Sequence, residues 1–160
     1  MNDCKYGHHV DGTEMRLSLL RAPKEPDEAA DMGEHEFTYS LMPHEGTYVE
    51  ADTVKLAYAL NVPMQASVVD SHSGNLPASH SFFSVDAPNV ILETVKKAEK
   101  EDTIIVRLYE CHNKRATVKL NTSLPVRAAY ECDLMEDNLH EVAFSDGHIH
   151  FEMKPFEIRT

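Results

Sequence analysis

The 160-residue sequence has no tryptophan, only three cysteines, and far fewer basic than acidic residues. Its 15 Lys and Arg against 27 Asp and Glu give a formal net charge of -12. Nucleic acids and anionic membranes are bound through clustered cations, so we expect no nucleic-acid and no membrane partner. No apolar run approaches membrane-spanning length, and the first twelve residues are too polar for a secretory signal.

The three cysteines, Cys4, Cys111 and Cys132, are odd in number and form no CxxC pair. This pattern is typical of reduced thiols, and we therefore predict a cytoplasmic protein. Cys111 falls in an alternating strand pattern, so a small core residue is favoured over a nucleophile. GxSxG, P-loop, GxGxxG and HExxH motifs are also absent. Composition and spacing alone therefore indicate only a β-rich chain.

The second half of the chain consists of short alternating segments. Residues 90–98 and 103–111 alternate around a charged bend, which predicts a β-hairpin. An amphipathic helix over 90–100 is the alternative, but Pro88 and the β-branched residues favour strand. Further strands are expected at 80–85, 116–121, 126–134, 139–144, 148–153 and 156–159, with a hairpin turn at Ser145-Asp146-Gly147. Such spacing without helices predicts an antiparallel β-sandwich over 80–160.

The first half is less regular. Strands are expected at 15–20 and 37–42, a turn at 43–46, a helix at 51–61 with Asp52 as its N-cap, and a strand-like segment at 67–70. Residues 70–79, DSHSGNLPAS, are rich in turn formers and predict a linker. We therefore expect two domains, 1–75 and 80–160, of which the first resembles the edge of a larger sheet.

A long irregular loop begins at Arg21, in RAPKEPDEAADMGEHEF. Loops of this length in a compact chain are usually functional or disordered. Its carboxylates are Asp27, Glu28, Asp31, Glu34 and Glu36. Paired carboxylates can hydrolyse a glycosidic bond, but a dense acidic run is more often a solvated loop, and spacing alone favours the latter.

The ten histidines raise the possibility of a metal site. His148 and His150 would share one face of a strand, which is a genuine metal-ligand spacing. No third ligand is marked, however, and the alternation points Ile149 and Phe151 inward and both histidines outward. A solvated pair is therefore favoured, and we expect no metal or other cofactor in this chain.

Four segments carry a resemblance to a known family. They are NDCKYGHHVDG at 2–12, MRLSLLRAPKEPDEAADMGEHEFTYSLMPHEG at 15–46, FFSVDAPNVILETVKKAEKEDTIIVRLYEC at 82–111 and PFEIRT at 155–160. In order, they resemble the C-terminal part of family 38 glycoside hydrolases, the class II α-mannosidases, and most of all the bacterial and cytosolic branch. The resemblance implies an all-β fold: the truncated end of a larger β-sandwich with one short helix, followed by the small C-terminal β-sandwich.

The resemblance also implies a parent activity, the retaining hydrolysis of terminal α-mannosides. In this family the aspartate nucleophile and the zinc ligands lie in an N-terminal α/β barrel, which this sequence lacks together with the helical domain. The chain is thus expected to be an inactive C-terminal fragment. Its partner would be the remainder of the mannosidase chain, which would hold both Zn²⁺ and the oligosaccharide substrate.

Within such an enzyme, the loop that begins at Arg21 is the candidate to lie near substrate. Arg21 offers a planar fork for sugar hydroxyls or a carboxylate, and Asp27, Asp31 and His35 would hold the loop or touch sugar. Equally open is that Arg21 only pairs with Asp27 or Asp31 to order the loop. The family motif around Tyr6 is expected to pack at a strand end.

Two alternative functions, from classes other than enzymes, also remain open. A free-standing carbohydrate-binding module would stack sugars on exposed aromatics, which the absence of Trp disfavours. An oligomerisation module is the other, because a truncated sandwich leaves open edges that pair. We expect a homo-oligomer formed through bare apolar surface. The expected lining is Met15, Leu17, Leu19, Phe37, Tyr39 and Leu41.

Overall fold

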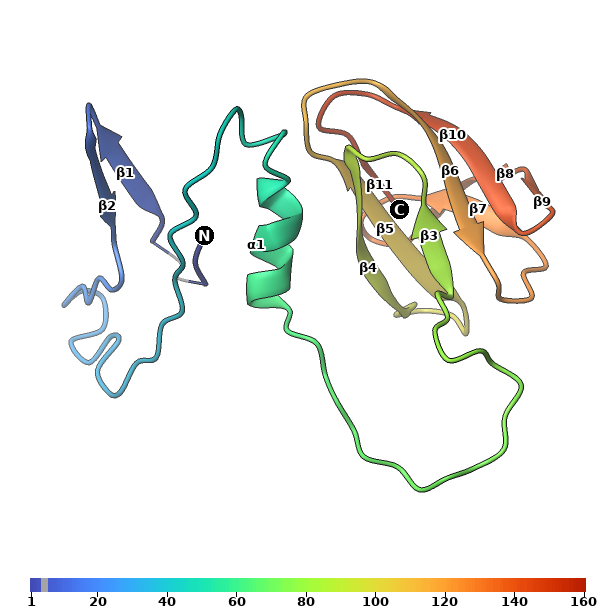
Figure 1. Ribbon diagram of the computed structural model, residues 1–160, viewed down its shortest axis with the longest axis horizontal. Helices are drawn as coiled ribbons and strands as arrows, with labels where there is room; N and C mark the ends of the chain where they lie inside the picture. Colours follow the sequence, from blue (N-terminus) through green and yellow to red (C-terminus); the bar gives the residue numbers. More distant parts are fainter. Residues whose placement is uncertain (4–5) are drawn as a thin grey trace. The chain divides into compact units, whose positions relative to one another are not determined.

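The computed structural model describes residues 1–3 and 6–160 and divides them into two compact units, residues 1–68 and 69–160. The described part is mostly antiparallel β-structure with one short helix, which confirms the predicted all-β class (Figure 1). Residues 70–79 contain neither helix nor strand. No helix in the described part has the length and apolar character needed to cross a membrane.

The second unit contains nine strands in three antiparallel sheets. They are β3 (Phe83–Val85), β4 (Val90–Lys97), β5 (Ile104–Glu110), β6 (Ala116–Thr122), β7 (Ala129–Cys132), β8 (Asn138–Val142), β9 (Phe144–Ser145), β10 (His148–Met153) and β11 (Ile158–Arg159). The sheet orders are β3-β6-β10-β9, β11-β5-β4 and β7-β8. Figure 1 shows the first two sheets as the layers of a sandwich.

One continuous core fills the space between these two layers. Val118 and Met153 come from one sheet and Leu108 and Val90 from the other, and all four side chains are buried. They sit at alternate, inward positions of their strands; the other face is polar in β6 and β10 and mixed in β4 and β5. The sequence pattern therefore predicted the sandwich.

The hairpin of β4 and β5 confirms the interpretation of its sequence. Its register runs from Val90 opposite Glu110 to Lys97 opposite Ile104, so the helical alternative is wrong. A register shift between Leu92 and Thr94 marks a β-bulge. The predicted turn between β9 and β10 is also present: Asp146 and Gly147 have φ of 52° and 84°, as a type I′ turn requires.

The first unit holds the hairpin of β1 (His8–Asp11) and β2 (Glu14–Leu17), and the helix α1 (Thr53–Asn61). The strand expected at 37–42 is wrong: this segment forms a single antiparallel bridge, between Tyr39 and Asn2. The alternation in the segment is real, but its described partner spans only residues 1–3. The strand expected at 67–70 is also wrong, since that stretch is irregular and exposed.

Asp52 is not the side-chain cap of α1, contrary to the sequence prediction. Its φ is 53°, its side chain caps no helical N–H, and it pairs instead with Lys55 at 3.1 Å. A capping-box pattern is found one turn earlier, where it closes the turn that precedes the helix. There the Glu50 carboxylate accepts the Thr47 N–H at 2.7 Å, and the Thr47 hydroxyl accepts the Glu50 N–H at 3.3 Å. The T-x-x-E spacing was a readable signal that the sequence interpretation missed.

Candidate functional site

The loop after β2 is held at two points by one tyrosine hydroxyl. Tyr6 Oη lies 2.9 Å from the backbone carbonyl of Arg21 and 3.0 Å from Asp31 Oδ2. These contacts join the first residue of the loop to its middle, across 15 and 25 positions of sequence. Sequence analysis expected Tyr6 only to pack at a strand end, because separations of this size leave no periodic signal.

Around Asp31 the loop is braced by a histidine. His35 Nε2 lies 2.8 Å from the Asp31 carbonyl oxygen, and the His35 ring stacks on Phe37 with centroids 6.0 Å apart. Asp31 itself has φ of 55°, a left-handed conformation that Asp tolerates better than most residues. Asp31 and His35, both predicted as site residues, are thus brought together, and His35 holds the loop.

Asp27 shapes a separate turn in the same loop. Its Oδ1 accepts the Ala29 N–H at 2.9 Å and its carbonyl accepts the Ala30 N–H at 3.2 Å. This is the local side-chain bond through which Asp commonly nucleates turns. Asp27 is exposed, so it remains able to touch a ligand as well.

The Arg21 guanidinium is exposed. None of the ion pairs between residues that the structure describes joins Arg21 to Asp27 or Asp31, so the self-pairing alternative receives no support. The order of the loop comes from Tyr6 and His35 instead. A fixed backbone with an unengaged cationic fork is the arrangement that can present two parallel N–H donors to a carboxylate or to sugar hydroxyls.

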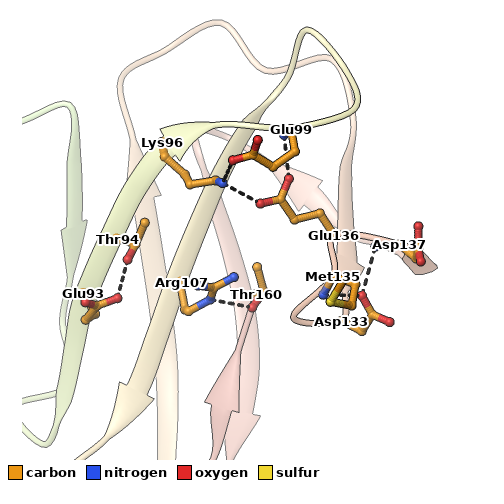
Figure 2. A network of polar contacts seen from close by, with 10 residues as sticks. All are labelled: Glu93, Thr94, Lys96, Glu99, Arg107, Asp133, Met135, Glu136, Asp137 and Thr160. Atoms are coloured by element: carbon orange, nitrogen blue, oxygen red, sulfur yellow. Dashed lines mark hydrogen bonds and ion pairs between the residues drawn. The ribbon is translucent and has the colours of Figure 1, made fainter. Parts of the chain in front are cut away.

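A second polar cluster, shown in Figure 2, is structural in character. Lys96 Nζ lies 2.8 Å from Glu136 Oε1 and 2.5 Å from Glu99 Oε1, and Glu136 also accepts the Glu99 N–H at 2.7 Å. The bonds from Glu136 and then Glu99 raise the pKa of Lys96, and Lys96 in turn lowers the pKa of Glu136. Nearby, Arg107 Nε donates to Thr160 Oγ1 at 3.2 Å. The contacts of Glu136 fasten the β4–β5 bend to the loop between β7 and β8, and the Arg107 bond joins β5 to Thr160.

Glu110 is a buried carboxylate that sequence analysis passed over as a site. Its side chain is only 1% exposed and accepts from Asn89 Nδ2 at 2.9 Å, His112 N at 2.7 Å and Phe156 N at 2.9 Å. Burial by itself raises its pKa, but the bonds from Phe156, Asn89, His112 and Lys114 outweigh burial and lower it. A carboxylate so enclosed stays ionised and anchors the chain, and it has no opening through which to act on a substrate.

No metal or thiol centre emerges among residues 1–3 and 6–160. No group of three or more His, Cys, Asp or Glu side chains there could hold a metal ion. The rings of His148 and His150 lie edge to face, 5.1 Å apart, with His150 exposed and His148 half-buried. Cys111 and Cys132 are both buried, and burial together with nearby acidic charges raises the pKa of Cys132, which disfavours a nucleophilic thiolate at that position.

Comparison with protein families gives two matches. Residues 89–160 match the model described as the glycosyl hydrolases family 38 C-terminal beta sandwich domain. Residues 1–29 match the glycosyl hydrolases family 38 C-terminal domain. The first match covers the strands from β4 onward, and the second covers the β1–β2 hairpin together with Tyr6 and Arg21.

Similar curated proteins are α-mannosidases from distant organisms. The chain is 44% identical to alpha-mannosidase 2C1 of Mus musculus, 35% to alpha-mannosidase G of Dictyostelium discoideum and 34% to alpha-mannosidase of Saccharomyces cerevisiae. Each alignment includes 100% of this chain but only 15–16% of the relative. The chain thus spans about a sixth of the length of the proteins it matches.

Proposed function

Because the chain carries the C-terminal β domains of family 38 glycosyl hydrolases, we propose that it is the C-terminal part of an α-mannosidase. The proposed activity is the retaining hydrolysis of terminal α-mannosides. The observation that carries this proposal is the continuous similarity of all 160 residues to several α-mannosidases, each about six times longer. Such a share is what a C-terminal region of a larger enzyme would give.

We infer that this region supplies scaffold and one active-site loop, and that the remainder of the enzyme supplies the chemistry. Retaining hydrolysis needs a nucleophile and an acid about 5 Å apart across the bond. The carboxylates described above are either enclosed, as Glu110 is, or engaged in turns and ion pairs. The nucleophile, zinc and substrate are therefore assigned to the rest of the mannosidase chain.

The loop that follows β2 is the proposed point of contact with substrate. Arg21 combines an exposed guanidinium with a backbone held by Tyr6. Fixed positioning of such a group lowers the entropic cost of orienting a sugar or a catalytic carboxylate. Asp27, Asp31 and His35 then act chiefly as the supports that keep the loop in shape.

The test compares two forms of the protein. The 160-residue chain should not cleave an aryl α-mannoside, whereas a full-length mannosidase that carries this segment should. Arg21→Ala in the full-length enzyme should lower kcat/KM by about tenfold or more, with an unchanged melting temperature. Cleavage by the 160-residue chain that a point mutation within it removes would overturn the proposal.

A second proposal, self-association of the isolated chain, rests on the β1–β2 hairpin. Val10 and Met15 are cross-strand partners on one face and are 64% and 66% exposed, next to the His8–Leu17 pair. Bare apolar surface of this kind favours association. The 160-residue chain should therefore form dimers or larger species by light scattering, and Met15→Glu should weaken them. A monomer at high concentration would contradict this.

We further infer a cytosolic location. The Cys132 thiol is free and buried, and the chain has an odd number of cysteines, three, with no CxxC pair. Free buried thiols suit a reducing compartment. Fractionation of the source cells, with the protein in the soluble cytosolic fraction, would support the inference, and recovery from a secretory compartment would contradict it.

A further inference from the structure

The hydroxyl of Tyr6 sits where the rigid and the irregular parts of the first unit meet. Gly7, the next residue, accepts the Ser18 N–H at 3.1 Å, which extends the β1–β2 ladder to the base of the hairpin. Two residues beyond Ser18 the chain leaves the hairpin through Leu20 into Arg21. Tyr6 is therefore held by the hairpin, while its hydroxyl reaches the loop.

That hydroxyl contacts both ends of the segment 21–31. One contact is to a backbone carbonyl at 2.9 Å and the other is to a carboxylate at 3.0 Å. A phenol has a single proton, so the two acceptors share it or alternate in taking it. Either way, the phenol oxygen is the common point through which Arg21 and Asp31 are tied to the hairpin. Tyr6→Phe would keep the aromatic ring and remove the two hydroxyl contacts.

We propose that Tyr6 is a positioning residue that acts through Arg21. By fixing the Arg21 carbonyl, it fixes the backbone from which the guanidinium projects. This inference rests on the proposed function of the loop, because it assumes that Arg21 works on substrate or on a catalytic carboxylate. It adds a specific dependence: the contribution of Arg21 to catalysis requires the Tyr6 hydroxyl.

A double-mutant cycle in a full-length mannosidase that carries this segment tests the dependence. Tyr6→Phe and Arg21→Ala should each lower kcat/KM for an aryl α-mannoside by about tenfold. If Tyr6 acts through Arg21, the double variant should be no worse than Arg21→Ala alone. Tyr130→Phe is the matched control, because Tyr130 lies on β7, is half exposed and has no hydrogen bond assigned to its hydroxyl.

Limited trypsin digestion of the same enzymes gives a readout independent of activity. Arg21 and Lys24 are cleavage sites inside the loop. Tyr6→Phe should speed cleavage at both, while Tyr130→Phe should leave the rate at the wild-type value. The melting temperature should move little, which separates a loosened loop from an unfolded domain.

The outcomes distinguish the two proposals. If Arg21→Ala is damaging and Tyr6→Phe is silent, the positioning role is wrong and the function of the loop stands. Multiplicative effects of the two substitutions, with faster cleavage or without it, would show that Tyr6 acts elsewhere and would also overturn the inference. If Arg21→Ala is silent, the proposed contact with substrate and the role of Tyr6 fall together.

Discussion

The two units differ in where they place their apolar side chains. Every buried apolar residue in the described part of the chain lies between Val90 and Met153, inside the second unit. In the first unit the helix α1 buries no residue, and the apolar face of the β1–β2 hairpin is exposed. The second unit therefore carries its own core, whereas the described residues of the first unit bury no apolar side chain.

This difference decides how much of each unit a sequence pattern can predict. In a unit with a complete core, the alternation of apolar and polar residues follows the fold, so the sequence pattern is enough to predict that fold. In a unit without a core, the structure depends on individual hydrogen bonds, such as those of the Tyr6 hydroxyl and of the Thr47 capping box. The Tyr6 contacts hold the loop that begins at Arg21, and the capping box holds the turn before α1.

The largest expected effect is a difference in independent folding. Residues 69–160 alone should give dispersed amide NMR signals and a cooperative thermal transition, because they bury a two-layer core. Residues 1–68 alone should show neither, since burial is too small to offset their conformational entropy. Cooperative unfolding of the isolated first unit would contradict the comparison.

Next in size is the effect of truncating the core. Met153 is 1% exposed and Met64 is 97% exposed, so Met→Ala at the two positions compares the second unit with the first. Met153→Ala should lower the free energy of unfolding by about 2–5 kcal/mol, as cavity formation requires. Met64→Ala should change it by less than about 0.5 kcal/mol. Urea unfolding of both variants measures the difference, and equal effects would show that the second unit lacks the core described.

A smaller effect is expected at the one acidic side chain of this core region. Glu110→Gln should lower the free energy of unfolding at pH 7 by about 3 kcal/mol, because an amide cannot accept all the N–H groups that converge on Glu110. Its pKa in the fold lies below the ordinary value of 4.5, so the ionised form stabilises the fold above that pH. As the pH falls through the lowered pKa, this contribution is lost.

The difference in the free energy of unfolding between wild type and Glu110→Gln should therefore become smaller as the pH falls from 7 to 4 and below. Urea unfolding at a series of pH values measures the gap. Glu141→Gln, on the exposed face of β8, is the matched control and should show a small, nearly constant difference. A gap at Glu110 that widened in acid would mean that the carboxyl is protonated in the fold.

How far the sequence could predict this structure depends on whether the signal was local. The β4–β5 hairpin follows from alternation after Pro88, and the β9–β10 turn from Asp146-Gly147. The segment 37–42 alternates just as well, yet alternation shows which side chains share a face and does not reveal whether a long partner strand is present. The contacts of Tyr6 span 15 and 25 residues, and no spacing rule reaches that far.

The buried position of Glu110 could also have been predicted from the sequence. Ile104, Val106 and Leu108 point to one face of β5, and Glu110 continues their series. A carboxylate at an inward position must find donors, so the pattern already predicted a buried, hydrogen-bonded anchor. The site residues around Arg21 are different, because their proposed role depends on contacts that no pattern in this sequence predicts.

The smallest expected effect lies in the first unit, at the capping box before α1. Thr47→Ala removes the hydroxyl that accepts the Glu50 N–H and donates to the Glu50 carboxylate at 2.9 Å. It should cost about 1 kcal/mol of local stability in the turn that leads into the helix. Gly46→Ala should destabilise this region more, because Gly46 has φ of 69° and an added Cβ would lie 2.5 Å from Glu50 Oε2.

Amide hydrogen exchange over Thr53–Asn61 measures both effects in a full-length mannosidase that carries this segment. The exchange rate should rise in the order wild type, Thr47→Ala, Gly46→Ala, while exchange in β6 stays unchanged. Equal exchange in all three proteins would mean that packing against the rest of the enzyme, and not the capping box, holds this helix.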